Sequence, residues 1–234
     1  TTAGTVMVKD IFTGSSNSRP DNFASINDTL FFSAEDNSNG VELWRSDGTS
    51  AGTYMVKDIN AGSTGAYPQE LVVLNNKLIF VARGASTSSE LWESDGTAAG
   101  TVLLKDIDPG SSGSYPEHLT KAGNLIIFVA DDGSNGEELW KTDGTTAGTV
   151  LITNIASGSD DIEVDEMEAV GSIVYIAMDD DANGYEVWKT DGTSAGTALV
   201  KNIASGSDDS YPEYLTDVGG VLYFSAEDDT NGTE

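Results

Sequence analysis

The chain has 234 residues, of which 39 are acidic and 11 are basic, so its formal net charge at pH 7 is −28. Such a charge repels polyanions such as nucleic acid and anionic membrane surfaces, and it attracts cations. Cysteine is absent, which excludes disulfides and thiolate metal sites. No apolar run reaches the ~18 residues of a membrane span, and the N-terminus lacks the basic segment and apolar core of a signal peptide. We therefore expect a mature or excised segment that neither enters a membrane nor binds nucleic acid.

One unit is repeated along the whole chain. The tripeptide Ala-Gly-Thr begins at Ala3, Ala51, Ala99, Ala147 and Ala195, so the period is 48 residues with no insertion or deletion. Each unit is rich in Gly, Ser, Thr, Asn and Asp, which is typical of short strands joined by tight turns. A fixed period of this length indicates a repeat architecture. We predict a single domain over residues 1–234.

Each full unit contains four strand-like runs. In the second repeat these are residues 53–59, 71–74, 77–82 and 90–94, and the last run ends in the hairpin signal Asp95-Gly96. The short connections predict antiparallel neighbours and hence a four-stranded meander. Leu91 and Trp92 are both large and apolar but point to opposite faces of one strand, so both faces of the sheet must be covered. Sheets stacked around an axis satisfy this condition, and we predict an all-β fold, a β-propeller of four-stranded antiparallel blades.

The two ends of the chain indicate how a ring could close. Residues 6–11 have the phase of a blade's outermost strand, and they could complete a last blade whose inner strands are residues 215–218 and 221–226. This arrangement would give five blades and would remove exposed sheet edges. The same phase would arise if the chain were a piece of a longer array of roughly six to eight blades. The sequence leaves both alternatives open.

The repeated string resembles a known family. ELWRSDGTSAGT, ELWESDGTAAGT, ELWKTDGTTAGT and EVWKTDGTSAGT are similar to the ELWxxDGT repeats of bacterial extracellular proteins, and the resemblance covers the whole chain. It implies a repeat module of large secreted or surface proteins that is expected to form propellers, and it brings no catalytic residues with it. We therefore expect an extracellular or cell-surface location and a chain that is part of a larger protein.

The loop between the third and fourth runs is the best candidate for a metal site. Oxygen-bearing side chains at its first, third and fifth positions, followed by Gly at the sixth, match the opening of a calcium loop. The candidate ligands are Asp179, Asp181 and Asn183; Asp131 and Asn135; Glu227, Asp229 and Asn231; and Glu35, Asn37 and Asn39. We predict that Ca²⁺, if bound, is structural. The alternative is that these residues form solvated hairpin turns without an ion.

The loop of residues 83–88 is the exception among these loops. It contains no carboxylate and has Arg83 where the other loops have Asp or Glu. We expect a blade without metal here, in which a guanidinium partly replaces the ion.

A second candidate site precedes the innermost strand of each blade. The residues proposed to bind a ligand are Tyr67, Glu70, Tyr115, Glu117, Tyr211 and Glu213, which belong to Tyr-Pro segments, and Arg19-Pro20 and Glu163-Val164 are variants of these segments. An aromatic ring beside a carboxylate suits stacking on a sugar and hydrogen bonding to its hydroxyls. The alternative, which the usual bias of aromatic residues favours, is that Pro fixes the start of the strand and Tyr packs between blades.

Other recurring residues are predicted to serve the fold. Trp44, Trp92, Trp140 and Trp188 are expected in the core. Asp47, Asp95, Asp143 and Asp191 are expected to accept backbone hydrogen bonds in Asp-Gly turns. Lys9-Asp10, Lys57-Asp58 and Lys105-Asp106 are expected to be exposed pairs that contribute little to stability.

The sequence gives no convincing catalytic constellation. His118 is the only histidine, so no site that needs two histidines can be built, and no nucleophile elbow is present. We predict a non-enzymatic extracellular binding or scaffold module of the adhesion type, with a protein or carbohydrate ligand at the mouth of the central channel. The alternatives are a multivalent carbohydrate-binding lectin with near-equivalent sites between blades and, less favoured, a glycan-acting hydrolase with two carboxylates in a deep cleft.

Overall fold

A computed structural model describes residues 4–156, 158–180 and 182–234. Ala3, which marks the first repeat, and Asp181, a candidate calcium ligand, lie outside the described residues. The contacts divide the chain into two compact units, Thr1–Tyr115 and Pro116–Glu234, and each is described by itself. The described part of the chain contains no helix with the length and hydrophobicity that crossing a bilayer requires.

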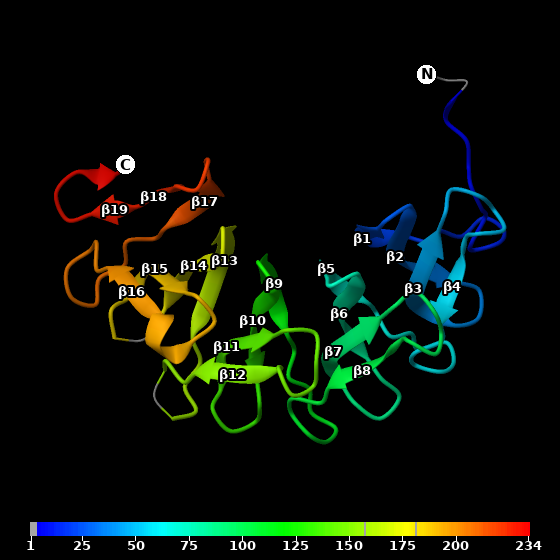
Figure 1. The fold of residues 1–234 in the computed structure, drawn as a ribbon, viewed down its shortest axis with the longest axis horizontal. Coiled ribbons are helices and arrows are strands. Elements are labelled where there is room, and N and C mark those ends of the chain that lie inside the picture. The colour runs from blue at the N-terminus through cyan, green and yellow to red at the C-terminus, as the bar shows by residue number, and fades with distance from the viewer. Residues whose placement is uncertain (1–3, 157, 181) are drawn as a thin grey trace. The chain divides into compact units, whose positions relative to one another are not determined.

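The first unit contains two four-stranded antiparallel sheets in chain order (Figure 1). Their strands are β1 (Asp21–Ile26), β2 (Thr29–Asp36), β3 (Gly40–Ser46) and β4 (Tyr54–Lys57), then β5 (Gln69–Leu74), β6 (Lys77–Arg83), β7 (Ser89–Ser94) and β8 (Val102–Lys105). The predicted runs of the second repeat therefore coincide with β4, β5, β6 and β7. We call each four-stranded sheet a blade, in which the strand that precedes the first hairpin is innermost.

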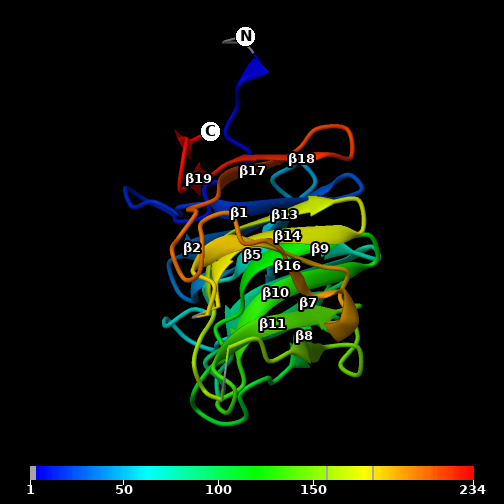
Figure 2. The same ribbon diagram turned by 90° about the vertical axis from the view of Figure 1, so that its left-hand side faces the viewer.

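The second unit contains two further blades and part of a third. Its strands are β9 (Glu117–Ala122), β10 (Leu125–Asp131), β11 (Glu137–Thr142) and β12 (Val150–Thr153); β13 (Glu163–Val170), β14 (Ile173–Asp179), β15 (Tyr185–Thr190) and β16 (Ala198–Lys201); and β17 (Glu213–Asp217), β18 (Leu222–Ser225), β19 (Glu227–Asp228) and β20 (Gly232–Thr233). A single 3₁₀ turn, η2 (Ser194–Gly196), lies before β16. The innermost strands β9, β13 and β17 are neighbours, as Figure 2 shows for β13 and β17.

The second and third strands of each blade carry the core. In β6, five consecutive residues from Leu78 to Ala82 are buried, because both faces of the sheet are covered. Phe80 lies directly opposite Trp92 of β7, and Phe32 and Phe128 face Trp44 and Trp140 in the same way. The prediction of core tryptophans is confirmed for Trp44, Trp92 and Trp140, whereas Trp188 is only partly buried.

Neighbouring blades within each unit share one apolar core. In the first unit, Phe31 and Leu43 of one blade pack with Leu78 and Phe80 of the next. In the second unit the shared cluster includes Ile127, Leu139, Val174 and Ile176. The sheets are therefore stacked face to face, as the paired apolar residues of the ELW strand predict.

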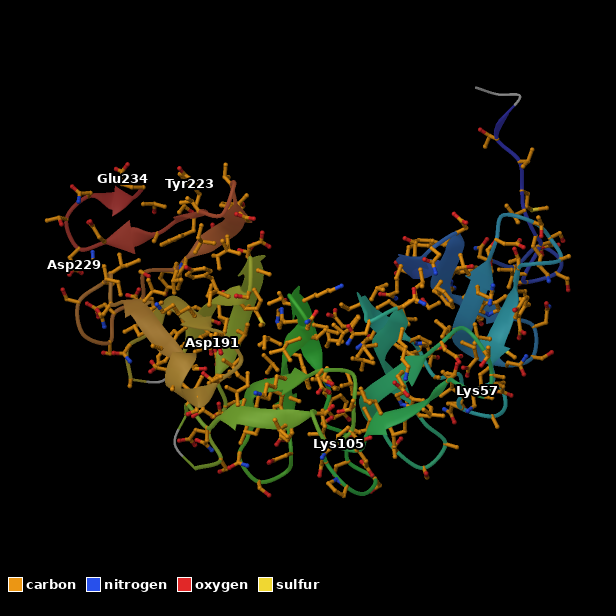
Figure 3. All side chains as sticks on the ribbon, in the orientation of Figure 1. Lys57, Lys105, Asp191, Tyr223, Asp229 and Glu234 are labelled. Atoms are coloured by element: carbon orange, nitrogen blue, oxygen red, sulfur yellow. The ribbon has the colours of Figure 1, made fainter. Side chains whose placement is uncertain are left out.

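Lysine side chains form hydrogen bonds to the backbone of the next repeat. Lys57 Nζ donates to the carbonyl oxygen of Thr101 at 2.7 Å, and Lys9 Nζ donates to that of Thr53 at 2.6 Å (Lys57 is labelled in Figure 3). The prediction that these lysines form exposed pairs with the adjacent aspartates is wrong. Because successive blades are stacked, a backbone carbonyl of the next repeat lies within reach of each ammonium group.

The N-terminal segment differs from the prediction. No strand is assigned to residues 6–11, and Val6 and Met7 are exposed. The strands that share this phase, such as β4 and β8, are each paired with the ELW strand that comes before them in the chain. The number of blades and the closure of the ring stay predictions.

The shared core predicts a large cost for truncating a central residue. Leu139 has no exposed surface, so Leu139→Ala should lower the free energy of unfolding by about 2–5 kcal/mol. Val150→Ala, at a position that is 38% exposed, is the matched control and should cost much less. Urea denaturation of both variants measures the difference, and equal midpoints would contradict the assignment of this core.

Candidate functional site

The most repeated residues of the sequence form a hydrogen-bonded turn. Asp143 Oδ1 accepts hydrogen bonds from the Thr145 backbone N at 2.9 Å and from Thr145 Oγ1 at 2.7 Å, and Thr145 Oγ1 accepts one from Gly148 N at 2.9 Å. A Cβ atom at Gly148 would lie 2.1 Å from Asp143 Oδ1, so a larger residue would displace the Asp143 side chain from this turn. The side-chain hydrogen bond from Thr145 lowers the pKa of Asp143, although slight desolvation opposes this shift.

The same turn recurs in the other three repeats. Its aspartates are Asp47, Asp95 and Asp191, which bond to Thr49, Thr97 and Thr193. The prediction that these aspartates accept backbone hydrogen bonds is confirmed. The DGTxAGT part of the repeat therefore stabilises the fold through these turn hydrogen bonds.

The glutamate of the ELW segment is a buried anchor that the sequence analysis missed. Glu138 has no exposed surface, and its carboxylate accepts hydrogen bonds from Ile155 N and Ala156 N at 2.9 Å each. These two residues begin the loop that leads from β12 to the next blade. Burial raises the pKa of Glu138 to about 7, although the backbone hydrogen bonds favour the charged form.

The equivalent glutamates hold the residue just before the next blade's first strand. Glu42 accepts from Ala66 N at 3.0 Å, and Glu90 and Glu186 accept from the hydroxyls of Ser114 and Ser210 at 2.7 and 2.8 Å. Ala66, Ser114 and Ser210 each precede a tyrosine that the sequence analysis proposed as a ligand contact. The signal in the sequence was a glutamate that recurs directly before the apolar Leu-Trp or Val-Trp pair of each repeat.

We call these three residues, Tyr67, Tyr115 and Tyr211, the corner tyrosines. Their side chains are 50%, 51% and 57% exposed, whereas the prolines that follow them are buried. The buried prolines agree with the interpretation that Pro fixes the start of the strand. The interpretation that Tyr packs between blades holds in part, because Tyr211 stacks on Tyr185 of the preceding blade with ring centroids 6.3 Å apart, although all three rings are half-exposed. Each corner tyrosine has a positive φ, between 43° and 50°, a region that residues other than glycine rarely adopt.

A second positive φ follows three residues later and marks a bulge. Glu70, His118 and Tyr214 have φ values of 54°, 57° and 60°, and the register of the innermost strand shifts at this point. The carboxylates proposed beside the tyrosines are therefore not equivalent. Glu117 and Glu213 lie two residues after a corner tyrosine and are exposed, whereas Glu70 occupies the bulge and is half-buried.

Two hollows lie beside the corner segments at equivalent places in the two units. The Tyr214 hollow, of about 400 Å³, is lined by Asp165, Glu166, Pro212, Glu213 and Tyr214. The Tyr67 hollow, of about 200 Å³, includes Asp21, Asn22, Tyr67, Pro68 and Gln69. Asp165 and Glu213 stand three repeats after Asp21 and Gln69, so both hollows lie between the innermost strands of adjacent blades.

The candidate calcium loops connect the second and third strands of each blade. In the first blade Asp36, at the second loop position, accepts hydrogen bonds from Ser38 N at 2.7 Å and from Asn39 N at 2.6 Å, and its Oδ2 accepts from Asn39 Nδ2 at 2.8 Å. We call this arrangement the Asp–Asn clamp. Burial of Asp36 opposes its charge, but the hydrogen bonds outweigh it and lower its pKa.

The clamp recurs in the other acidic loops. It joins Asp132 to Asn135, Asp180 to Asn183, and Asp228 to Asn231, and the hydrogen bonds from Asn231 and Thr230 lower the pKa of Asp228 to about 2. The fifth-position asparagines proposed as calcium ligands, Asn39, Asn135, Asn183 and Asn231, are thus bonded to the second-position aspartate. That aspartate was not among the proposed ligands.

The other proposed calcium ligands are dispersed in the described residues. Asn37 Oδ1 accepts from Thr13 N at 2.8 Å, Asp229 accepts from the Ser205 hydroxyl, and Glu35 lies 3.8 Å from Arg19. Asp131 Oδ1 accepts from Gly133 N at 2.7 Å, and Asp179 and Glu227 end β14 and begin β19. Outside residues 1–3, 157 and 181, no three Asp, Glu, His or Cys side chains are grouped so that they could hold a metal ion.

The comparisons with known proteins concern the fold. No family model matches the sequence, and no curated protein matches it. Among solved structures, the chain is similar to prolyl oligopeptidase B from Galerina marginata, with a TM-score of 0.52 and 11% identity over 91% of this chain and 34% of that chain. It is similar to a puromycin hydrolase S511A mutant, with a TM-score of 0.51 and 16% identity over 88% of this chain and 32% of that one. The matched parts are propeller domains.

The chain has a β-propeller fold. A third similar structure is the computationally designed Ika8 protein, with a TM-score of 0.48 and 16% identity over 89% of this chain and 55% of that chain. The chain spans between about a third and about half of the length of these solved chains. At such low sequence identities the similarity supports the fold but not a function. The predicted propeller of four-stranded antiparallel blades is confirmed.

The buried glutamate predicts a pH-dependent stability. The pKa of Glu138 is about 7 in the folded chain against an ordinary value of 4.5, so its contribution to stability is complete below pH 4.5 and is lost as the pH rises through about 7. Glu138→Gln removes this titration. Between pH 5 and 7, the free energy of unfolding should fall less steeply in the variant, by up to about 1.4 kcal/mol per pH unit.

Urea denaturation at several pH values measures these slopes. Glu117→Gln, at an exposed position, removes the same charge and serves as the control. Parallel curves for the wild type and Glu138→Gln would contradict the assignment.

The Asp–Asn clamp predicts a loss of stability that does not depend on calcium. Asp132→Ala removes the hydrogen bonds to Ser134 N, Asn135 N and Asn135 Nδ2 and should lower the free energy of unfolding by about 1–3 kcal/mol. The loss should be the same with calcium and with chelator. Ser134→Ala, in the same loop, is the control and should have little effect. A loss that appears only in calcium would instead show that an ion closes this loop.

Proposed function

We propose that this chain is a non-enzymatic binding module that takes neutral sugars in the hollows between its blades. The observation that carries the proposal is the Tyr214 hollow, whose counterpart three repeats earlier is the Tyr67 hollow. Both hollows combine a tyrosine ring with short polar side chains. Sites of this kind, repeated along an array, suit a ligand that is itself repetitive.

The chemistry of the Tyr214 hollow favours a sugar. Tyr214 is 72% exposed and offers a rigid amphipathic face on which a pyranose ring can stack. Asp165 and Glu213 supply carboxylate oxygens, which accept hydrogen bonds from hydroxyl groups. Glu166 is already engaged, because its Oε2 accepts from Leu215 N at 3.1 Å and so holds the strand that carries Tyr214. The three acidic residues of this hollow favour a neutral ligand over an anionic one.

The backbone supports a binding role for this region. Residues in the left-handed region cost of order 1–3 kcal/mol each, and such positions cluster at sites that recognise ligands. Two of them occur at each Tyr-Pro segment, one at the corner tyrosine and one at the bulge. The buried glutamates add hydrogen bonds that fix the residue before each corner tyrosine.

The wider setting is also part of the proposal. The ELW and DGT strings resemble the ELWxxDGT repeats of bacterial extracellular proteins. We therefore extend the proposal to a secreted or surface protein of which this chain is one module. Five repeat phases favour five blades. Calcium stays a separate prediction, strongest for the loop that contains Asp179 and Asn183; a melting temperature that falls on chelation would establish it.

The proposal predicts a selective loss of sugar binding. Tyr214→Ala should weaken binding of the neutral glycans found on a glycan array by about two- to tenfold, because a stacking contact is worth about 0.5–1.5 kcal/mol. Tyr223→Ala is the matched control, since Tyr223 is 59% exposed but does not line the hollow. Both variants should have the same melting temperature as the wild type. An array without any bound neutral glycan, or equal losses in the two variants, would overturn the proposal.

A further inference from the structure

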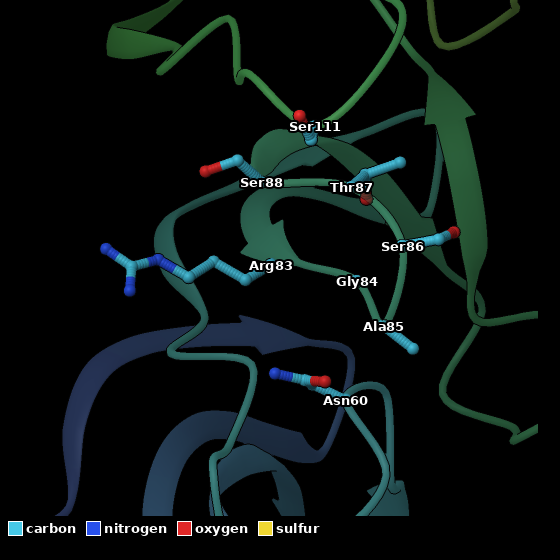
Figure 4. Close-up of a pocket in the computed structure, with 8 residues that line it drawn as sticks. All are labelled: Asn60, Arg83, Gly84, Ala85, Ser86, Thr87, Ser88 and Ser111. Atoms are coloured by element: carbon cyan, nitrogen blue, oxygen red, sulfur yellow. The ribbon is translucent and has the colours of Figure 1, made fainter.

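A third hollow, at the loop of residues 83–88, differs in its chemistry from the hollows beside the corner segments. It has a volume of about 490 Å³, which lies within the range of small-molecule sites. Three separate segments of the first unit form it, and they contribute Asn60, residues 83–88 and Ser111 (Figure 4). Figure 4 shows Arg83 and Ser88 extending from the two ends of the loop, with Asn60 on a separate segment. We call it the Arg83 pocket.

The pocket exists because this loop lacks the Asp–Asn clamp. Gly84 and Thr87 stand one repeat after Asp36 and Asn39, so the carboxylate and the amide that close the first blade's loop are both missing. Thr87 Oγ1 cannot replace the clamp, and it is buried without a hydrogen-bond partner among the described residues. A polar hydrogen-bonding atom in this state indicates an absent partner such as a ligand or water.

A cross-loop contact is missing as well. In the first blade Asn37 accepts hydrogen bonds from Thr13 N and Oγ1, at 2.8 and 3.1 Å, and so connects two loops. The residues one repeat later are Ala85 and Ala61, which cannot form this contact. The space between the loops therefore stays open in this blade.

The charge of the pocket is opposite to that of the protein. No Asp or Glu lines it, although the chain contains 39 such residues, and Arg83 provides its one formal charge. Among the described residues no carboxylate lies within ion-pair distance of Arg83. The guanidinium instead lies 5.7 Å from the centre of the Tyr67 ring, which orients it without neutralising it. At physiological salt the Debye length is about 8 Å, so the distant acidic surface is largely screened from a ligand held here.

We propose that the Arg83 pocket binds a sugar that carries a carboxylate, as a uronic acid does. Arg83 donates to the carboxylate, because guanidinium and carboxylate form paired, charge-assisted hydrogen bonds. The hydroxyls of Ser86, Thr87 and Ser111 donate to and accept from the hydroxyls of the ring, and Ser88 Oγ, which donates to Tyr115 Oη at 3.2 Å, accepts from them. The Arg83 pocket shares no lining residue with the Tyr214 and Tyr67 hollows, so either proposal can fail without the other.

Titration of the ¹⁵N-labelled chain with sodium glucuronate, followed by NMR, tests the proposal. Saturable shifts are expected at the amides of residues 84–88 and at Ser111, with a dissociation constant in the millimolar range. Arg83→Gln should weaken binding at least about tenfold, since a hydrogen bond to a charged group is strong. Arg83→Lys keeps the charge but not the paired geometry and should give an intermediate loss. The double variant Gly84→Asp/Thr87→Asn restores the first blade's clamp residues and should abolish the shifts.

Two controls separate this site from general effects. Arg19→Gln removes the other strongly exposed arginine of the first unit, whose side chain is 78% exposed, and should leave glucuronate binding unchanged. Glucose, which lacks the carboxylate, and acetate, which lacks the ring, should each bind at least about tenfold more weakly than glucuronate. The Tyr214→Ala variant should bind glucuronate like the wild type, which distinguishes failure here from failure of the neutral-sugar proposal.

Several results would overturn the proposal. One is that the wild type and Arg83→Gln bind glucuronate with equal affinity. Another is that the wild type binds glucose or acetate as tightly as glucuronate. The third is that glucuronate causes no saturable shifts. Should Arg83→Gln fail to fold, Ser86→Asp introduces a repelling carboxylate at an exposed position, and unchanged affinity in that variant would overturn the proposal equally.

Discussion

A buried carboxylate that holds the start of the next loop is the constraint on which the rest of the structure depends. Glu42, Glu90, Glu138 and Glu186 have no exposed surface, and each accepts hydrogen bonds from the segment that connects its blade to the following one. A buried charge is stable only when such donors surround it. The connecting segment is therefore fixed in position, and after Glu42, Glu90 and Glu186 so is the tyrosine that begins the Tyr-Pro segment of the next blade. Buried carboxyl groups therefore hold the segments that carry the exposed rings.

The acidic residues of this chain divide into three environments. The ELW glutamates are buried, and burial raises the pKa of Glu42 and Glu138 to about 7. The aspartates of the Asp-Gly turns and of the Asp–Asn clamps accept several hydrogen bonds, which lower the pKa of Asp47, Asp143 and Asp228. The carboxylates of the Tyr-Pro segments, such as Glu117 and Glu213, are exposed. Composition alone counts all of them as one negative charge, although their surroundings differ.

The residues that the repeats share are not the residues proposed to bind ligands. The positions that are the same in every repeat, in the ELW and DGTxAGT strings, are occupied by core packing and turn hydrogen bonds. The positions that differ are those where hollows form: the Tyr-Pro segments, and the loop where Arg83, Gly84 and Thr87 replace the acidic residues and the asparagine. A propeller built from near-identical blades gains distinct sites only where one repeat departs from the others. The Arg83 pocket is such a departure, since a missing clamp opens the space and a missing carboxylate changes its charge.

The sequence by itself determined the strands, their order and the two-sided burial of the ELW strand, because these follow from a short-range pattern of apolar and turn residues that repeats every 48 positions. It also predicted the role of Asp143 and its equivalents, since Asp-Gly turns are local. It missed that Asp36 rather than Glu35 organises its loop, although the donors Ser38 and Asn39 are close in sequence. It could not decide whether the corner tyrosines pack or are exposed, or which glutamate is buried. These outcomes depend on donors and surfaces that lie 17 to 24 residues away in the chain and meet only when blades stack. Tertiary structure decided them because burial and hydrogen bonding are properties of neighbours in space.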